Sequence, residues 1–199
     1  MISTLPNLSS LSIDDELWEY LLVLHPDPLV CSQIREEKDQ FEKRFEHNAF
    51  ASAQPRITLA NFLAKEAMEG TLNRWIFNIC KLQAPFDVHI NNYSSIPPHT
   101  IYLRIQDPAP FQQLANQLQI IDSFIQSNDC PPLILISRPF LALAQRLPEP
   151  IYQEAIKEYA QKHFTASFRA DKLTLLKRQH ESAPCQLVDS FGLTSTYAN

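Results

Sequence analysis

The chain has 199 residues, of which 45% are hydrophobic and 20% charged, and its formal net charge is −5. This composition is typical of a soluble globular protein with a sizeable core. The negative charge argues against bulk DNA binding, which needs a dominant basic face. The two glycines are too few to build either of the common Gly-rich phosphate loops.

Cysteine spacing and hydrophobicity exclude further classes of protein. The four cysteines lie about 50 residues apart without a CxxC pair, so we expect buried free thiols, no metal site and no cofactor. No apolar run approaches the roughly 18 residues that cross a membrane, and the N-terminus lacks the layout of a signal peptide. We therefore expect a cytoplasmic protein that does not bind membranes.

The first half of the chain predicts the order strand, helix, strand, helix. The apolar run Tyr20–Leu24 is typical of a buried strand. Asp27 followed by Pro28 predicts a helix start, and we expect this helix to end near Glu46 with its charged stretch facing solvent. The stretch PRITLAN (55–61) predicts the second strand, and an apolar stripe of helical spacing follows it. The expected inner faces of the two helices consist of Val30, Ile34, Phe41 and Phe45, and of Met68, Leu72, Trp75, Ile76 and Ile79.

The second half repeats this order. Ile101–Ile105 predicts a strand, Asp107-Pro108 a helix start, PFLALAQ (139–145) a second strand, and Pro148-Glu149 a second helix start. The expected inner faces of these helices consist of Phe111, Leu114, Leu118, Ile121 and Ile125, and of Ile151, Ala155 and Tyr159. Further strands are expected at 86–93, 164–168, 173–176 and 186–191, and turns at Asn91-Asn92, Pro97-Pro98 and Asp129.

The stretches PRITLAN and PFLALAQ align without a gap at an offset of 84 residues. We therefore expect an α+β fold: two β-α-β-α units that pack as pseudo-symmetric lobes, with antiparallel sheets around a central groove. The predicted parts are a flexible arm at 1–15, a single bilobal domain at 16–193 with repeats at 18–84 and 99–163 and terminal strands at 164–193, and a tail at 194–199.

These segments resemble the 2H phosphoesterase superfamily, and specifically its 2′-5′ RNA ligase-like branch. The resemblance covers about residues 18–193 and rests on the segments YLLVL (20–24), PRITLANF (55–62), PPHTIYLRI (97–105) and SRPFLALAQRLP (137–148). It implies one His-x-Thr or His-x-Ser motif in each lobe, on strands that face a shared groove. It also implies hydrolysis of 2′,3′-cyclic phosphates or formation of 2′-5′ bonds, with one His removing a proton and the other protonating the leaving oxygen.

The chain departs from the family at the motifs themselves. Arg56 and Phe140 stand where the family has its histidines, Thr58 keeps the first hydroxyl position, and Ala142 replaces the second. Side chains alternate along a strand, so these four positions are expected to face the groove. An arginine stays protonated at neutral pH and a phenylalanine has no proton to exchange, so neither can perform the acid–base step. The chain is therefore expected to be a pseudoenzyme.

The sequence leaves open what the altered groove binds. Arg56 and Thr58 could hold a phosphate, or Arg56 could fill a disused groove, paired with a carboxylate. Phe140 could stack on a base, or it could plug the site. Arg146 and His99, the latter near the expected groove mouth, are further candidates for substrate binding.

Three functions follow from these alternatives. The first is an inactive protein that still binds a small phosphate ester, a nucleotide or an RNA end. The second is a working phosphodiesterase or RNA ligase that uses other groups. The third is a protein-interaction scaffold with a filled groove. Among the other histidines, His25 is expected in a turn, and His163 and His180 have no partner at a suitable spacing.

Overall fold

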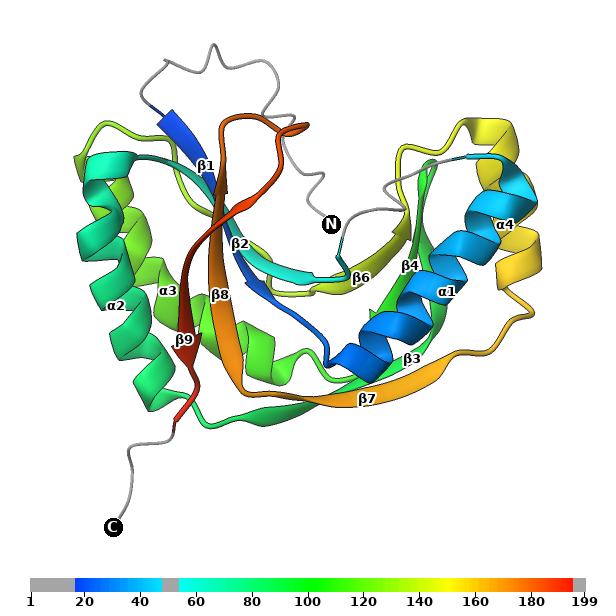
Figure 1. Ribbon diagram of the computed structural model, residues 1–199, viewed down its shortest axis with the longest axis horizontal. Helices are drawn as coiled ribbons and strands as arrows, with labels where there is room; N and C mark the ends of the chain where they lie inside the picture. Colours follow the sequence, from blue (N-terminus) through cyan, green and yellow to red (C-terminus); the bar gives the residue numbers. More distant parts are fainter. Residues whose placement is uncertain (1–16, 48–53, 195–199) are drawn as a thin grey trace.

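A computed structural model describes residues 17–47 and 54–194 of the chain (Figure 1). The predicted arm at 1–15 and the predicted tail at 194–199 lie outside these residues, apart from Thr194. The elements are β1 (Leu17–Leu24), α1 (Pro28–Phe45), β2 (Ile57–Lys65), the 3₁₀ turn η2 (Glu66–Met68), α2 (Glu69–Leu82), β3 (Phe86–Ile96), β4 (Thr100–Ile105), α3 (Ala109–Ser127), β5 (Ile134–Leu135), β6 (Phe140–Ala144), α4 (Glu149–Tyr159), β7 (Thr165–Ala170), β8 (Lys172–Arg178) and β9 (Gln186–Gly192).

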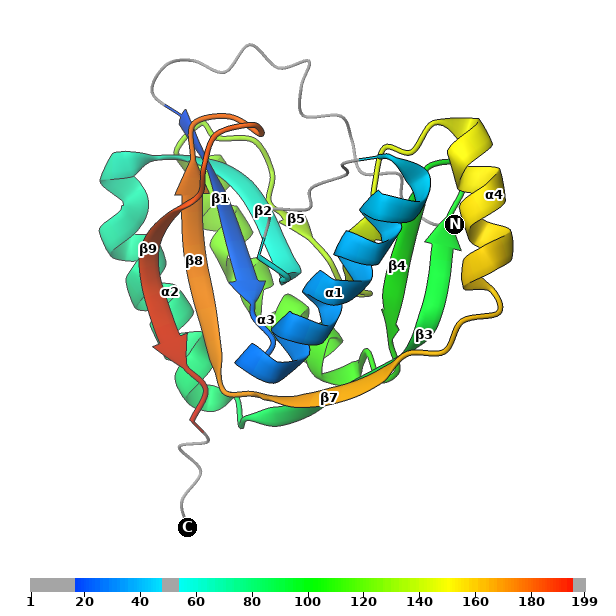
Figure 2. The ribbon, with the colours of Figure 1, turned by 45° about the vertical axis from the view of Figure 1, so that its right-hand side comes forward.

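The strands form two antiparallel sheets. The first sheet has the order β5-β2-β1-β8-β9, and the second has the order β6-β4-β3-β7. Helices α2 and α3 lie along the first sheet, and α1 and α4 lie along the second (Figure 1 and Figure 2). The predicted α+β fold with antiparallel sheets is therefore confirmed, whereas the single domain over 16–193 stays a prediction.

Each repeat supplies its first helix to the strands of the other repeat. Helix α1, from the first repeat, packs against β6 and β7. Its Phe41 and Phe45 join a buried cluster with Ile101, Leu143 and Tyr159 of the second repeat. Helix α3, from the second repeat, packs against β2 and α2. Neither repeat therefore covers its strands with its own helices alone.

The two Asp-Pro pairs begin their helices differently. Asp27 caps α1 as predicted, because its Oδ1 accepts a hydrogen bond from the backbone N–H of Val30 at 2.8 Å. Asp107 instead accepts from the N–H of Ala109 at 2.9 Å, and α3 begins one residue later than predicted, with Pro108 at the N-cap.

One local prediction is wrong, and one element has no signal in the sequence. Strand β3 runs through Asn91-Asn92, where a bulge opposite β4 puts Asn92 in a left-handed conformation (φ 58°) that asparagine tolerates. Ile151 is only partly buried in α4 but packs against the core cluster that contains Tyr152. Strand β5 has only two residues, too few to show a periodicity.

The segment from β5 to β6 brings the two repeated strands together. Strand β5 pairs with β2 at the edge of the first sheet, and the N–H of Ile136 then donates to the carbonyl of Leu59 at 2.8 Å. The chain next pairs with β4 as β6, at the edge of the second sheet. Cα atoms of β2 and β6 come within 8 Å of one another. The strands that carry the altered motifs therefore lie side by side where the two sheets meet (Figure 1).

The helices and the cysteines bear on two expectations drawn from the composition. Within the described ranges, no helix is long and apolar enough to cross a membrane. Cys31, Cys80 and Cys130 are buried free thiols, as predicted, but Cys185 is partly exposed. The exception matters because Cys185 contacts one of the motif positions, as described below.

Candidate functional site

The four motif positions turn away from the hydrophobic core. Along β2 and β6 the intervening residues are at most 2% exposed, because the strand alternates its side chains between two faces. The buried residues are Ile57, Leu59, Leu141 and Leu143, and the partly exposed motif positions are Arg56, Thr58, Phe140 and Ala142.

Arg56 lies immediately before β2 and has a sulfur atom as its hydrogen-bond partner. Its Nη1 donates to the Sγ of Cys185, which precedes β9, at 3.3 Å. None of the ion pairs between described residues involves Arg56. A guanidinium carries five N–H donors. Because the contact with Cys185 uses one of them, Arg56 keeps donors for a ligand.

His25 lies beside Arg56 on the neighbouring strand. Leu24 pairs with Ile57 in the β1–β2 ladder, so the next residues along each antiparallel strand are His25 and Arg56. The Nδ1 of His25 lies 3.1 Å from the carbonyl oxygen of Pro55. Because a carbonyl only accepts, Nδ1 carries the proton and Nε2 is the second ring nitrogen left for other contacts. The sequence placed this histidine after a strand but did not predict its position beside the first motif.

The second motif position presents an apolar surface. Phe140 packs against Tyr102 of β4 in a tilted arrangement, with ring centroids 4.8 Å apart and an interplanar angle of 43°. Ala142 pairs with Tyr102 in the β4–β6 ladder. Neither Phe140 nor Ala142 can donate, accept or transfer a proton through its side chain.

His99 and Arg146 lie together beyond the end of β6. The Nδ1 of His99 is 2.9 Å from the Oγ1 of Thr100, and its backbone carbonyl accepts from the N–H of Leu147 at 3.0 Å. Arg146 forms an ion pair with Glu181 of the turn between β8 and β9. Thr100 and Glu181, the partners described for these two side chains, are not motif positions.

Lys38 is a functional candidate that the sequence prediction placed wrongly. The charged stretch of α1 was expected to face solvent, but Lys38 is only 8% exposed and lies on the inner face of the helix. It follows Ile34 by four residues and precedes Phe41 by three, which is the spacing of one helical face. No hydrogen bond or ion pair engages its ammonium group within the described part of the chain.

The charges that act on Lys38 and His25 are positive. Burial lowers the pKa of Lys38, and Arg56 and Arg35 lower it further. Burial also lowers the pKa of His25, the hydrogen bond to the backbone carbonyl opposes this, and Arg56 and Lys172 lower the pKa again. The described residues contain no group of three or more His, Cys, Asp or Glu side chains that could hold a metal ion.

Glu19 and Arg178 form a nearly buried ion pair on the first sheet. The Nε and Nη2 atoms of Arg178 on β8 donate to the two carboxylate oxygens of Glu19 on β1, at 2.5 and 2.9 Å. The Nδ2 of Asn61 on β2 adds a third hydrogen bond to Glu19 at 2.9 Å. Arg178 also donates to the backbone carbonyl of Glu181 at 2.7 Å. Its charge is therefore matched by Glu19 and is not free for a ligand.

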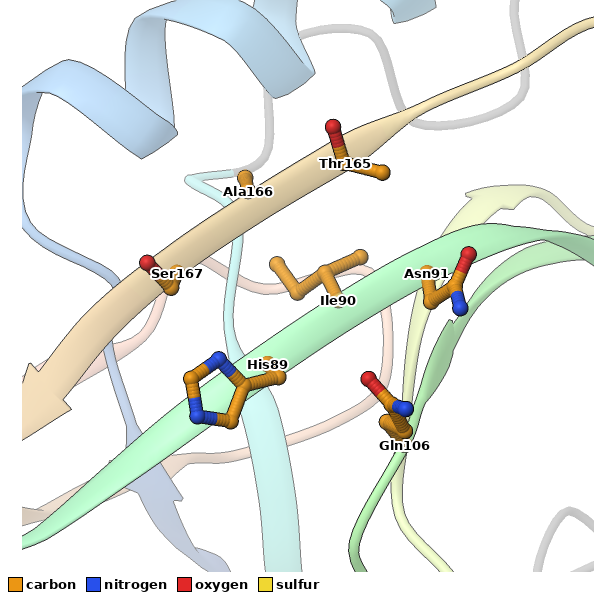
Figure 3. A pocket seen from close by; sticks show the side chains of 7 residues that line it. All are labelled: His89, Ile90, Asn91, Gln106, Thr165, Ala166 and Ser167. Carbon is orange, nitrogen blue, oxygen red and sulfur yellow. The ribbon is translucent and has the colours of Figure 1, made fainter.

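Neither of two surface cavities is lined by a motif position. The larger, of about 350 Å³, lies over β3 and β7 (Figure 3). His89, Asn91 and Gln106 line it from β3 and the end of β4, and Thr165 and Ser167 line it from β7. The smaller, of about 130 Å³, lies between β3, β4 and α4. The larger cavity offers hydrogen-bonding groups without a lysine or arginine, so it differs in charge from the region around Arg56.

Comparison with known proteins agrees with this architecture. The sequence matches the model of the 2′-5′ RNA ligase superfamily over residues 26–181. No curated protein matches the chain in sequence. The solved structure of TT0787 from Thermus thermophilus has a TM-score of 0.65 at 14% identity, covering 90% of this chain and 100% of that one. E. coli LigT complexed with 3′-AMP has a TM-score of 0.63, and LigT complexed with NADP+ has one of 0.61, each at 16% identity over 90% of this chain and 99% of LigT.

These two kinds of likeness carry different weight. At such low identities the solved structures show only that the fold is shared, and the fold is the one expected of 2H phosphoesterases. The family model, in contrast, covers most of the chain and includes both altered motifs. The chain therefore belongs to the 2′-5′ RNA ligase superfamily of 2H phosphoesterases.

Proposed function

We propose that the protein is a catalytically inactive member of this superfamily that binds a phosphate ester through Arg56 and Thr58. The ligand class is a small phosphate ester, a nucleotide or an RNA end. The observation that carries the proposal is the state of Arg56: a cation at the first motif position whose hydrogen-bond partner is a thiol and not a carboxylate. A guanidinium in that state can present two N–H groups to two phosphate oxygens.

The inactivity follows from the chemistry of the two replaced positions. Acid–base catalysis needs groups that gain and lose a proton near the working pH. Arg56 remains protonated, and Phe140 is fixed against Tyr102 without a titratable atom. Neither of the two nearby histidines stands at a motif position: His99 is hydrogen bonded to Thr100, and His25 bonds the carbonyl of Pro55 through Nδ1. The motif positions therefore supply neither a proton acceptor nor a proton donor for a bound phosphate.

The ligand class is supported by charge and by the relatives. Lys38, Arg35 and Lys172 add positive charge around Arg56 and His25, and electrostatic attraction of this sign favours phosphate. LigT has been solved with 3′-AMP, NADP+, ATP and phosphate, each of which carries phosphate groups. We further propose a cytoplasmic location, where free thiols such as the three buried ones stay reduced.

A protein-interaction scaffold is the second candidate function. One observation favours it: neither surface cavity is lined by Arg56, Thr58, Phe140 or Ala142. A scaffold would bind no small phosphate, so the two candidates differ in a direct binding measurement.

Two measurements test the proposal. Calorimetric titration with inorganic phosphate should show binding that Arg56→Met abolishes and that the control Arg138→Met, an exposed arginine before β6, preserves. Hydrolysis of nucleoside 2′,3′-cyclic phosphates should stay at background for the native protein and rise in the combined variant Arg56→His, Phe140→His, Ala142→Thr. Substantial native turnover would contradict inactivity, and equal phosphate binding by native protein and Arg56→Met would favour the scaffold.

A further inference from the structure

The side chain of Lys38 is mostly buried, but its Nζ is not among the fully buried polar atoms without a partner, so the ammonium group reaches solvent. Lys38 is only 8% exposed on the inner face of α1, in line with Ile34 and Phe41, and no described residue gives it a hydrogen bond or an ion pair. Shielding a charge from water without a partner is costly, and proteins normally pair such a group or leave it where a ligand can supply the opposite charge. Lys38 has no such pair among the described residues, so its ammonium group is available to an anion.

The position of Lys38 connects it to the first motif. Helix α1 packs against β6, and β6 lies beside β2, which Arg56 immediately precedes. The charge of Arg56 acts directly on Lys38, and it also acts on His25, its neighbour across the β1–β2 ladder. Lys38 on α1 and His25 directly after β1 therefore both lie near Arg56, directly before β2.

Two acidic residues near this cluster in sequence have other partners, and Asp39 and Glu42, which are also close to Lys38 along α1, form no ion pair with it. Glu37, next to Lys38 on α1, accepts a hydrogen bond from the Tyr93 hydroxyl at 2.6 Å. Asp27, two residues after His25, caps the N-terminus of α1 through the N–H of Val30. Arg35 and Lys172, which also act on the cluster, are cations. The local charge is therefore positive and uncompensated within the described residues.

We propose that Lys38, Arg56 and His25 form one binding site for the terminal phosphate of a phosphomonoester, and that this site prefers a monoester to a phosphodiester. The inference deepens the proposed function and rests on it. A terminal phosphate carries close to two negative charges above pH 7 and has three free oxygens. Arg56 can bind two of these oxygens and Lys38 the third, with Nε2 of His25 at the edge of the site. A diester carries one charge and two free oxygens, so it leaves Lys38 without a partner.

The test compares two small probes that differ in this one charge. Methyl phosphate is a dianion at pH 8, whereas dimethyl phosphate is a monoanion at any neutral pH. In calorimetric titrations of the full chain at pH 8, we expect the native protein to bind methyl phosphate at least about tenfold more tightly, the effect of one added charge-assisted hydrogen bond. Lys38→Met should lower the affinity for methyl phosphate to that for dimethyl phosphate and leave the latter unchanged.

Control variants separate this inference from the proposed function. Lys43→Met, at an exposed position of the same helix, should behave as the native protein, and a thermal melt of each variant establishes that it is folded. Arg56→Met should lose both probes. If the native protein binds both probes equally, or if Lys38→Met keeps the native preference, the monoester site is overturned while phosphate binding stands. If the native protein binds neither probe, the monoester site and the proposed function fail together.

Discussion

The Nη1 atom of Arg56 donates a hydrogen bond to the Sγ of Cys185 across 3.3 Å, and this contact ties the start of β2 to the start of β9. A thiol sulfur is a weak acceptor compared with a carboxylate. The contact therefore orients the guanidinium without neutralising it. An incoming phosphate competes with a weak partner and not with an ion pair.

Removal of this thiol should leave phosphate binding intact. We expect Cys185→Ala to bind inorganic phosphate within about fivefold of the native protein, because a single weak hydrogen bond contributes about 0.5–1 kcal/mol at most. Calorimetric titration measures this directly. A loss as large as that expected for Arg56→Met would mean that the sulfur itself is part of the binding site.

Replacement of Lys38 should stabilise the protein in the absence of ligand. Lys38→Met keeps the length of the side chain and removes a charge that is largely shielded from water and has no partner among the described residues, so we expect a gain of about 1–2 kcal/mol in the free energy of unfolding. For a chain of this size that gain corresponds to a rise of about 2–8 °C in the melting temperature. Lys43→Met, exposed on the same helix, should change the melting temperature by less than about 2 °C. A clear loss of stability in Lys38→Met would show that the ammonium has a favourable partner.

His25 should make stability depend on pH in the acidic range. Burial lowers the pKa of His25 in the folded protein, whereas the unfolded chain has the ordinary value of about 6.5. The unfolded state then binds the proton more readily, so the free energy of unfolding decreases as the pH falls below about 6.5.

The variant His25→Asn should remove this contribution. Urea unfolding at pH 7.5 and pH 5.5 should show a smaller loss of stability for His25→Asn than for the native protein. The exposed His180→Asn serves as the matched control and should keep the native loss. Identical pH dependence in all three proteins would mean that folding does not lower the pKa of His25.

The Glu19–Arg178 pair should couple strongly in a double-mutant cycle. Both side chains are nearly buried and share two hydrogen bonds, so removing one partner leaves the other charge uncompensated. We expect Glu19→Leu alone to cost about 3 kcal/mol, and Glu19→Leu with Arg178→Leu to cost clearly less than the sum of the single variants. Urea unfolding of the four proteins tests this, and additive losses would contradict the coupling.

The sequence predicted the strands and helices well because their signals are local. Hydrophobic periodicity places α3, whose predicted inner residues, Phe111 and Ile125 among them, are all buried. The Asp27–Pro28 pair fixes the start of α1 through one side-chain cap. The repeated heptapeptides also place β2 and β6, in which Ile57, Leu59, Leu141 and Leu143 are all buried. These signals need no knowledge of which element packs on which.

The candidate site was harder to predict because it depends on long-range contacts. Arg56 and Cys185 are 129 residues apart in the chain, and no spacing rule connects them. Lys38 was assigned to solvent because charged residues flank it, although its position in the apolar stripe indicated burial. His25 reaches the site only through the register of the β1–β2 ladder. Register across strands is set by the whole sheet and is not readable from either strand alone.

Helices α1 and α3 each pack against strands of the other repeat, and this exchange determines how the molecule unfolds. If either half melts, it withdraws a helix from the sheet that remains and exposes that sheet's apolar side to water. The two repeats therefore depend on each other's helices, and we expect heat or urea to unfold them in one cooperative transition.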